Sequence, residues 1–267
     1  MSNPGAYHAF IGRWSQLVAR KFLAWLNVGP NRSWLDVGCG TGALTTEILA
    51  LASPQRIWGL DPSEERINYA QKACPKAQFE VSNAESLPKD WCDFDVVVSG
   101  LALNVMPNPA QALSEIIRVT RPGGLVAAYC WDFVEGMQPL RYLWDALIEL
   151  DPNAAKVDPA YRYPLSQPEP LQQLFATVGL QSVELQRLEV PTPFKDFDDY
   201  WLPLLSGNGK TQRYLAGLEA SKRYRVREKL KERLPIQPEG TIHLSVKAWA
   251  IRGICSDNSP MWKTSLF

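Results

Sequence analysis

Asp36-Val37-Gly38-Cys39-Gly40-Thr41-Gly42 is the most informative stretch of this chain, because it joins the apolar run Trp34-Leu35 to a helical pattern. That pattern consists of apolar residues at positions 44, 48, 49 and 51. Glycines at such a junction let the backbone approach a ligand closely and let the helix pack near the strand. We therefore predict a strand, a ligand-binding turn and a helix over residues 34–51.

Strand-like and helix-like segments alternate along residues 34–130. The expected strands are residues 34–37, 57–60, 79–81, 94–98 and 125–130. Helices are expected over residues 44–51, from Ser63 onward and over residues 110–119, and Arg121-Pro122-Gly123-Gly124 is expected to form a turn. Such alternation predicts a doubly wound, Rossmann-like α/β fold with a mostly parallel sheet. A further helix is expected over residues 11–26.

Charge and apolar patterning limit the classes of protein to which the chain can belong. Lys plus Arg and Asp plus Glu number 28 each, so the overall charge favours neither nucleic acid nor an anionic membrane as a partner. Basic residues outnumber acidic ones over residues 210–233, a pattern typical of a solvated helix face. No apolar run reaches membrane-spanning length, and residues 1–6 lack the pattern of a signal peptide.

The cysteine and histidine content bears on compartment and metal binding. The five cysteines are scattered and form no Cys-x-x-Cys pair, and the chain contains only two histidines. This pattern favours free thiols in a reducing compartment over a disulfide framework or a zinc site. We therefore expect a cytoplasmic protein with no metal centre.

Two acidic residues discriminate between the cofactors that the glycine turn allows. Gly38-x-Gly40-x-x-Ala43 also satisfies the relaxed fingerprint of a dinucleotide site, so spacing alone is not decisive. Asp36 would repel a pyrophosphate in the turn but would attract the ammonium and sulfonium groups of S-adenosylmethionine (SAM). Asp61 lies about 20 residues beyond the turn, the separation at which a carboxylate accepts both ribose hydroxyls. Asp36 and Asp61 together favour SAM.

An ordered series of motifs resembles the class I SAM-dependent methyltransferases, specifically the methyltransferase type 11 family. The series covers residues 30–130 and consists of Asp36 to Gly42, Gly59-Leu60-Asp61-Pro62-Ser63, Asn83-Ala84-Glu85-Ser86-Leu87-Pro88, Phe94-Asp95-Val96-Val97-Val98-Ser99 and Arg121-Pro122-Gly123-Gly124. Asn83 departs from the family pattern, which usually has Asp at this position. An amide both donates and accepts hydrogen bonds, so the backbone of Ala84 and Glu85 takes more of the expected adenine recognition.

The resemblance implies a role for each residue of these motifs. Asp36 would approach the amino group of SAM, the turn would wrap its methionine part, and Asp61 would hold its ribose. Ser99 and Leu101 would line the end of the fourth strand near the methyl donor. The full set of expected cofactor residues is Asp36, Gly38, Cys39, Gly40, Gly42, Asp61, Pro62, Ala84, Glu85, Ser99 and Leu101.

The resemblance also implies a seven-stranded sheet, with a sixth strand at residues 181–190 and an antiparallel seventh at residues 242–254. Two segments then interrupt the family pattern, at about residues 131–167 and 191–240, and we expect both to be helical cap insertions. The predicted organisation is an N-terminal helical segment (1–29), a methyltransferase domain (30–255) and a tail (256–267).

The acceptor site is less well defined by the sequence. Tyr7, Arg13, Trp14, Asn104 and Trp131 are the candidate substrate residues, because they lie in the N-terminal helix, after strand four and after strand five. Packing and surface salt bridges explain such residues equally well. No catalytic base is predicted, since one is needed only where the acceptor atom must lose a proton.

The expected function is transfer of a methyl group from SAM to a small, partly apolar molecule. Methyltransferases of DNA amines carry Asn-Pro-Pro-Tyr or a near variant after strand four, and Ser99-Gly100-Leu101-Ala102-Leu103 offers no such amine clamp. Ten tryptophans are compatible with an apolar cavity. The alternatives are an NAD-binding oxidoreductase and a SAM-binding protein without catalytic activity.

Overall fold

The computed structural model describes residues 12–206 and 209–256, which divide into two compact units. Of the described residues, the α/β unit contains 19–130, 164–188 and 249–256. The helical unit contains 12–18, 131–163, 189–206 and 209–248.

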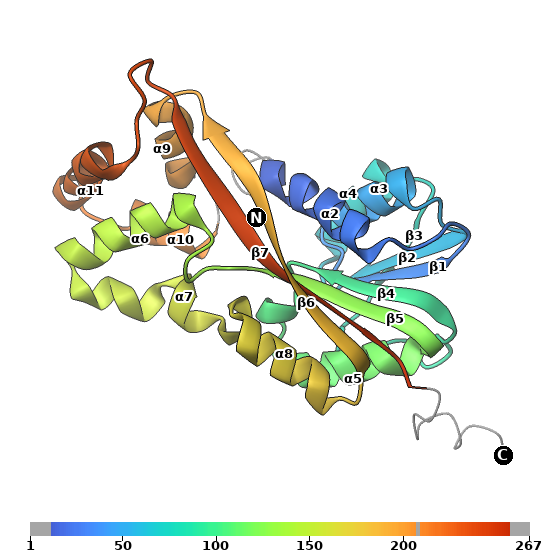
Figure 1. Ribbon diagram of the computed structural model, residues 1–267. Coiled ribbons are helices and arrows are strands. Elements are labelled where there is room, and N and C mark those ends of the chain that lie inside the picture. The colour runs from blue at the N-terminus through green and yellow to red at the C-terminus, as the bar shows by residue number, and fades with distance from the viewer. Residues whose placement is uncertain (1–11, 207–208, 257–267) are drawn as a thin grey trace. The chain divides into compact units, whose positions relative to one another are not determined.

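One seven-stranded sheet organises the chain (Figure 1). Its order is β3 (Gln78–Val81), β2 (Arg56–Asp61), β1 (Ser33–Val37), β4 (Phe94–Gly100), β5 (Thr120–Trp131), β7 (Ile242–Ile254) and β6 (Gln181–Phe194). The four pairings that join β3, β2, β1, β4 and β5 are all parallel. The prediction of a doubly wound, mostly parallel, seven-stranded sheet is confirmed.

Helices cover both faces of the sheet in the α/β unit. In Figure 1, α5 (Pro109–Val119) and α8 (Pro168–Thr177) lie on one face, and α2 (Arg13–Leu26), α3 (Ala43–Leu51) and α4 (Glu64–Ala73) lie on the other. Short helices η2 (Leu103–Val105) and η4 (Pro164–Ser166) complete the unit. Helix α4 begins where the Ser63 hydroxyl accepts the Arg66 N–H, and α5 where Asn108 Oδ1 accepts the Gln111 N–H.

Strand β4 contains a continuous run of β-branched residues because it is buried on both faces. Its valines at positions 96, 97 and 98 are at most 2% exposed, because a central parallel strand has helices on both faces. On one face, Val97 belongs to a cluster that includes Leu113 and Ile116 of α5 and Phe175 of α8. The core therefore holds the carboxyl ends of β1 and β4 in fixed positions.

Strand β5 begins earlier than the sequence predicts. The expected turn at residues 121–124 lies inside β5, where the pairing with β4 jumps from Phe94–Thr120 to Val96–Leu125. Gly123 has a positive φ of 67° at this irregularity. The prediction of a separate turn before the strand is thus wrong, because the Pro-Gly-Gly sequence forms a bulge within a paired strand.

The helical unit contains the helices of both expected insertions except η4, which belongs to the α/β unit. They are α6 (Gln138–Leu150), η3 (Pro152–Val157), α7 (Pro159–Arg162), α9 (Phe197–Ser206), α10 (Lys210–Ala216) and α11 (Ala220–Arg233). Strand β6 runs to Phe194, so the first residues of the expected second insertion are strand and not helix. The buried phenol of Tyr200 donates to the Pro139 carbonyl and thereby links α9 to α6.

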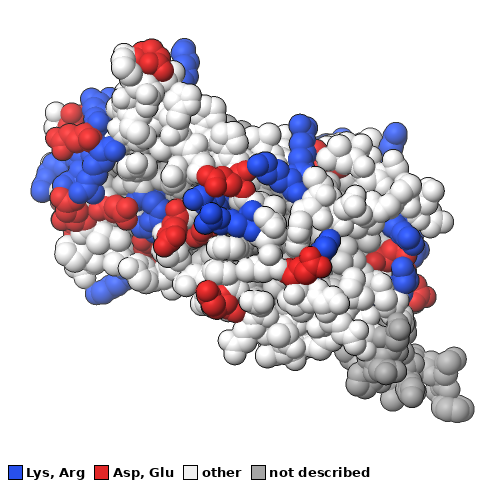
Figure 2. Space-filling model, in the orientation of Figure 1, with Lys and Arg blue, Asp and Glu red and all other residues white. Residues whose placement is uncertain are grey.

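The basic stretch at α11 is largely paired with acidic side chains. Lys229 and Arg233 both bind Glu149 of α6, and Lys222 lies 3.0 Å from Asp151. Figure 2 shows acidic and basic side chains interspersed over this part of the surface. The positive charge of α11 is therefore mostly balanced within the helical unit.

Candidate functional site

The glycine turn follows β1 as predicted and is fastened to the end of β2. The N–H groups of Gly38 and Cys39 both donate to the Leu60 carbonyl, at 2.8 and 2.9 Å. Gly38, Gly40 and Gly42 all have positive φ, at 77°, 56° and 87°. Three left-handed residues in one turn require glycine at each position, since other residues rarely adopt this conformation.

The surroundings of the three glycines differ. A Cβ on Gly38 would lie 2.5 Å from Ala102 Cβ, and one on Gly42 would lie 3.2 Å from Cys74 Sγ. A Cβ on Gly40 would have no neighbour within 4 Å. Gly40 is therefore the point of the turn at which open space adjoins the backbone, which is the feature a ligand requires.

Substituting Gly40 by Ala is expected to weaken cofactor binding more than the same substitution at Gly42 does. Each substitution places Ala in a left-handed conformation, which costs about 1–2 kcal/mol of folding free energy. Only the new methyl group at position 40 would enter the open space beside the turn. Calorimetric titration of both variants with S-adenosylhomocysteine (SAH) measures the loss of affinity. Their free energies of unfolding measure the folding cost separately. Wild-type affinity in Gly40→Ala would contradict the assignment of this space to the ligand.

Asp36 is fully buried near the end of β1, two residues before the first glycine of the turn. Its Oδ2 accepts the Thr45 hydroxyl at 2.7 Å, whereas Oδ1 is buried and has no hydrogen-bond partner among the described residues. Burial raises the pKa of Asp36 to about 7, against the lowering effect of Thr45, and the nearby charge of Asp61 raises it further. A buried carboxylate oxygen without a partner is suited to a cationic ligand group.

Asp61 lies at the end of β2 and is bound to the backbone on both of its oxygens. Oδ2 accepts the Gly40 N–H at 3.1 Å, and Oδ1 accepts the Ser63 N–H at 2.9 Å. Arg66 lies 3.6 Å from the same carboxylate. An ionised carboxylate has about four acceptor positions, so two remain for ligand hydroxyls. The sequence did not indicate that Asp61 also holds the glycine turn in place.

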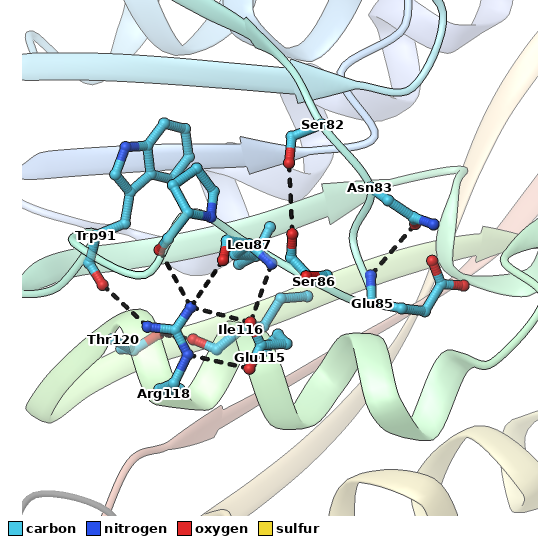
Figure 3. Close-up of polar contacts among 11 residues, drawn as sticks. Ser82, Asn83, Glu85, Ser86, Leu87, Trp91, Glu115, Ile116, Arg118 and Thr120 are labelled. Carbon is cyan, nitrogen blue, oxygen red and sulfur yellow. Dashed lines mark hydrogen bonds and ion pairs between the residues drawn. The ribbon is translucent and has the colours of Figure 1, made fainter.

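The segment after β3 contains the expected adenine residues. Asn83 Oδ1 accepts the Glu85 N–H at 3.3 Å (Figure 3). Glu85 Oε1 accepts the Asn108 N–H at 3.2 Å. Glu85 Oε2 is buried and without a hydrogen-bond partner in the described chain, and Ala84 is buried. The side-chain oxygen of Asn83 thus binds within the segment, and the side-chain NH2 group of Asn83 remains able to donate.

Two buried polar groups lie near the carboxyl end of β4, one on Ser99 within the strand and one on Asn104 in η2. The Ser99 hydroxyl and the Asn104 side-chain carbonyl have no hydrogen-bond partner within residues 12–206 and 209–256. Leu101 has a positive φ of 59° and donates its N–H to the Tyr129 carbonyl. A non-glycine residue in this conformation is uncommon and often marks a functional segment.

The two remaining expected cofactor residues, Cys39 and Pro62, differ in their surroundings. Cys39 is buried, with its Sγ close to Gly59, and burial together with the charges of Asp36 and Asp61 raises the pKa of its thiol. Pro62 is exposed between Asp61 and the N-cap of α4. Neither residue presents a group that would bind a charged ligand.

The expected substrate residues occupy both units. Trp14 and Trp131 belong to the helical unit and are 2% and 4% exposed, and Trp14 packs edge-on against Phe194 at 5.7 Å. Asn104 belongs to the α/β unit. Tyr7 and the side chain of Arg13 lie outside the described residues. In the same helical unit, Asp132 accepts the N–H groups of Val134 and Glu135.

Two further properties concern the described chain as a whole. No group of three or more His, Cys, Asp or Glu side chains within it is arranged to hold a metal ion. No helix in the same residues combines the length and the apolarity that crossing a membrane requires.

Comparison with known proteins shows what part of the chain resembles. A family model described as a methyltransferase domain matches residues 35–128, which include the glycine turn, Asp61, the Asn83 segment and β4. Residues 35–128 thus resemble a methyltransferase domain. The resemblance to the class I SAM-dependent methyltransferases is thereby confirmed, and the cofactor of this family is SAM.

Relatives of the methyltransferase domain extend the comparison to sequence and fold. Demethylmenaquinone methyltransferase of Lactobacillus johnsonii is 31% identical over 149 residues, which are 52% of this chain and 59% of that protein. The chain thus spans little more than half the length of this relative. Phosphoethanolamine N-methyltransferase 2 of Haemonchus contortus, solved with SAM, is 14% identical with a TM-score of 0.55, covering 92% of this chain and 53% of that one.

The same fold also occurs with a different chemistry. The [4+2]-cyclase SpnF has a TM-score of 0.53 at 18% identity, covering 91% of this chain and 81% of that one. Structural similarity at this level of identity shows the fold alone, so the activity must be argued from the site.

Proposed function

We propose that this chain transfers the methyl group of SAM to a small, partly apolar molecule. Two observations support this most strongly: Oδ1 of buried Asp36 has no hydrogen-bond partner in the described chain, and open space adjoins Gly40, four residues later. An ammonium group of the ligand would supply the missing partner and would stabilise the ionised form of the carboxyl group. A pyrophosphate would instead place negative charge beside it.

The residues described above would hold each part of SAM. Asp36 would bind the amino group, Gly38, Gly40 and Gly42 the methionine part, and Asp61 the ribose hydroxyls. Ala84 and Glu85 would border the adenine, while Ser99, Leu101 and Asn104 would lie beside the methyl donor. SAM supplies an activated methyl group on a good leaving group, so the protein has to align the acceptor and exclude water.

Three observations favour a small acceptor of mixed polarity. The charge of the chain is balanced, and the basic residues of α11 are largely paired with acidic ones. The segment after Ser99 has no clamp for a DNA amine. The Lactobacillus johnsonii relative is named for demethylmenaquinone. We propose demethylmenaquinone as the first acceptor to test.

A reducing compartment such as the cytoplasm suits this chain. All five cysteines are free thiols, and four of them are buried. Burial raises the pKa of the thiols of Cys39, Cys130 and Cys255 and thereby keeps them unreactive.

Titration calorimetry distinguishes the proposed function from its two rivals. We expect the wild-type protein to bind SAM and SAH and to give no heat with NAD. Binding of NAD without binding of SAM would establish the oxidoreductase alternative. Conversion of SAM to SAH is then measured against demethylmenaquinone and a library of small metabolites. Binding of SAM without turnover on any acceptor would favour the non-catalytic alternative.

Replacing Asp61 by Ala is expected to weaken SAM binding by about 1.5–3 kcal/mol, the usual contribution of hydrogen bonds to a charged group. This loss of binding free energy has two sources. The ribose loses its contacts with Asp61, and the Gly40 N–H loses the hydrogen bond that fixes the glycine turn. Arg66→Ala is the control, because Arg66 is exposed and lies 3.6 Å from the same carboxylate. Unchanged SAM affinity in Asp61→Ala would show that Asp61 does not bind the ribose.

A further inference from the structure

The segment between β3 and β4 is held by one arginine of α5. The Arg118 guanidinium donates to three backbone carbonyls of this segment, those of Leu87 (3.3 Å), Pro88 (3.2 Å) and Trp91 (3.3 Å). Figure 3 shows Arg118 pointing from α5 toward these carbonyls. Because a guanidinium has five donors in a rigid plane, it can bind several carbonyls that a single ammonium cannot reach together.

Glu115 completes the same attachment one turn earlier on α5. Its Oε2 accepts the Leu87 N–H at 2.9 Å and also lies 2.9 Å from Arg118 Nη2, while its Oε1 accepts from Arg118 Nε at 3.0 Å. Partial burial alone would raise the pKa of Glu115, but Arg118 and the Leu87 N–H outweigh it, so the pKa lies below its ordinary value. Glu115 and Arg118, here called the α5 clamp, therefore bind both the N–H and the carbonyl of Leu87.

The α5 clamp acts from a rigid base. Leu113 and Ile116, on either side of Glu115, are 1% and 2% exposed in the core of the α/β unit. At the other end of the segment, the Glu85 side chain accepts the N–H of Asn108, the N-cap of α5. Ala84 and Glu85 thus lie on a segment that α5 fastens on both sides, although the segment has little regular structure of its own.

We propose that Glu115 and Arg118 are positioning residues for the adenine ring of SAM. They hold the backbone of Ala84 and Glu85 in the conformation that binds adenine before the cofactor arrives. Without the α5 clamp, the segment would have to be ordered at the expense of binding free energy. This inference rests on the proposed assignment of Ala84 and Glu85 to the adenine.

Arg118→Met tests the inference, because Met keeps an unbranched apolar chain and removes the donors. We expect SAH to bind about tenfold more weakly, as the cost of ordering a short segment corresponds to about one power of ten in affinity. Binding of S-inosylhomocysteine, which carries oxygen in place of the adenine amino group, should fall less, so that the preference for SAH over this analogue shrinks. Hydrogen exchange at residues 82–91 of the free protein should become faster.

Arg121→Met is the matched control. Arg121 also pairs with a carboxylate, Asp95 at 2.8 Å, and with a carbonyl, that of Pro122, but neither contact reaches residues 82–91. We expect this variant to lose stability without any change in SAH affinity or in the preference for adenine. Should Arg118→Met fail to fold, Arg118→Lys keeps the charge with fewer donors and should show the same changes to a smaller degree.

The outcomes separate the inference from the proposed function. Wild-type SAH affinity and an unchanged preference for adenine in a folded Arg118 variant would overturn the role of the α5 clamp and leave the cofactor site intact. A wild-type protein that binds neither SAM nor SAH would overturn the cofactor site, and the inference with it.

Discussion

An Asp36→Asn variant is expected to become more stable than the wild type as the pH rises from about 4 to about 7. Burial raises the pKa of Asp36 from 3.8 in the unfolded chain to about 7 in the folded one. The protonated carboxyl group therefore favours folding fully below pH 4, and this contribution is lost as the pH rises through 7. A tenfold change in proton affinity corresponds to about 1.4 kcal/mol, so the difference between the two proteins should change by about 4 kcal/mol over this range.

The same substitution is expected to remove the pH dependence of SAM binding. In the wild type, the cofactor's ammonium group binds ionised Asp36, so affinity should rise about tenfold per pH unit from pH 5 and level off near 7. The amino group of SAM itself loses its proton near pH 8, which should lower affinity again. The Asn variant should bind weakly throughout, with no rise between pH 5 and 7.

Thr45→Val provides a check on the cause of this pH dependence. The Thr45 hydroxyl lowers the pKa of Asp36, so its removal should move the midpoint of the binding curve to higher pH. Urea unfolding at several pH values and calorimetric titration with SAM measure the two effects separately. A wild-type affinity that is constant from pH 5 to 7 would show that Asp36 does not bind the ammonium group.

Asp158→Ala is expected to destabilise the helical unit by about 3–5 kcal/mol, the usual cost of removing one partner of a buried ion pair. Asp158 is fully buried and binds Arg141 through two parallel contacts of 2.7 and 2.9 Å. Its Oδ1 also accepts the Ala160 N–H at the start of α7. The substitution leaves the Arg141 guanidinium, which is 15% exposed, without its main counter-charge.

Asp145→Ala tests whether burial of the ion pair causes the large loss of stability that is expected for Asp158→Ala. Asp145 pairs with the same arginine at 3.1 Å, but its side chain is 60% exposed. Exposed pairs contribute about 0–1 kcal/mol, so this variant should be close to the wild type. Unfolding in urea, followed by tryptophan fluorescence, compares the two. Equal losses of stability in both variants would show that the buried Arg141–Asp158 pair stabilises the helical unit no more than the exposed Arg141–Asp145 pair does.

Most of the fold was predictable because its signals are local. The run from Trp34 to Gly42 forms β1 and its turn, and Ser63 begins α4 as its side-chain chemistry indicates. Strand β4 was predictable from its β-branched residues. The bulge at Gly123 was not, because the Pro-Gly-Gly sequence suits a free turn and a bulge equally well, and only pairing with β4 distinguishes them.

The candidate site divides in the same way. Asp36 and Asp61 could be selected from sequence, since each follows a short apolar run, Asp36 just before the glycine turn and Asp61 at the end of the next expected strand. The α5 clamp could not be selected, because Glu115 and Arg118 look like an ordinary pair on a helix surface. Their contacts with Leu87 join residues 28 and 31 positions apart, a separation that no local pattern reports. Trp14 was expected near the acceptor and is buried against Phe194.

By itself, the sequence determined where the glycine turn lies and which charges flank it, because backbone sterics and short-range charge act over a few residues. Tertiary structure alone decided that Gly40 adjoins open space whereas Gly38 and Gly42 are packed. It also decided that Asp36 is buried deeply enough for its pKa to reach about 7. Burial and packing depend on segments that are distant in the chain, and these quantities exist only once those segments meet.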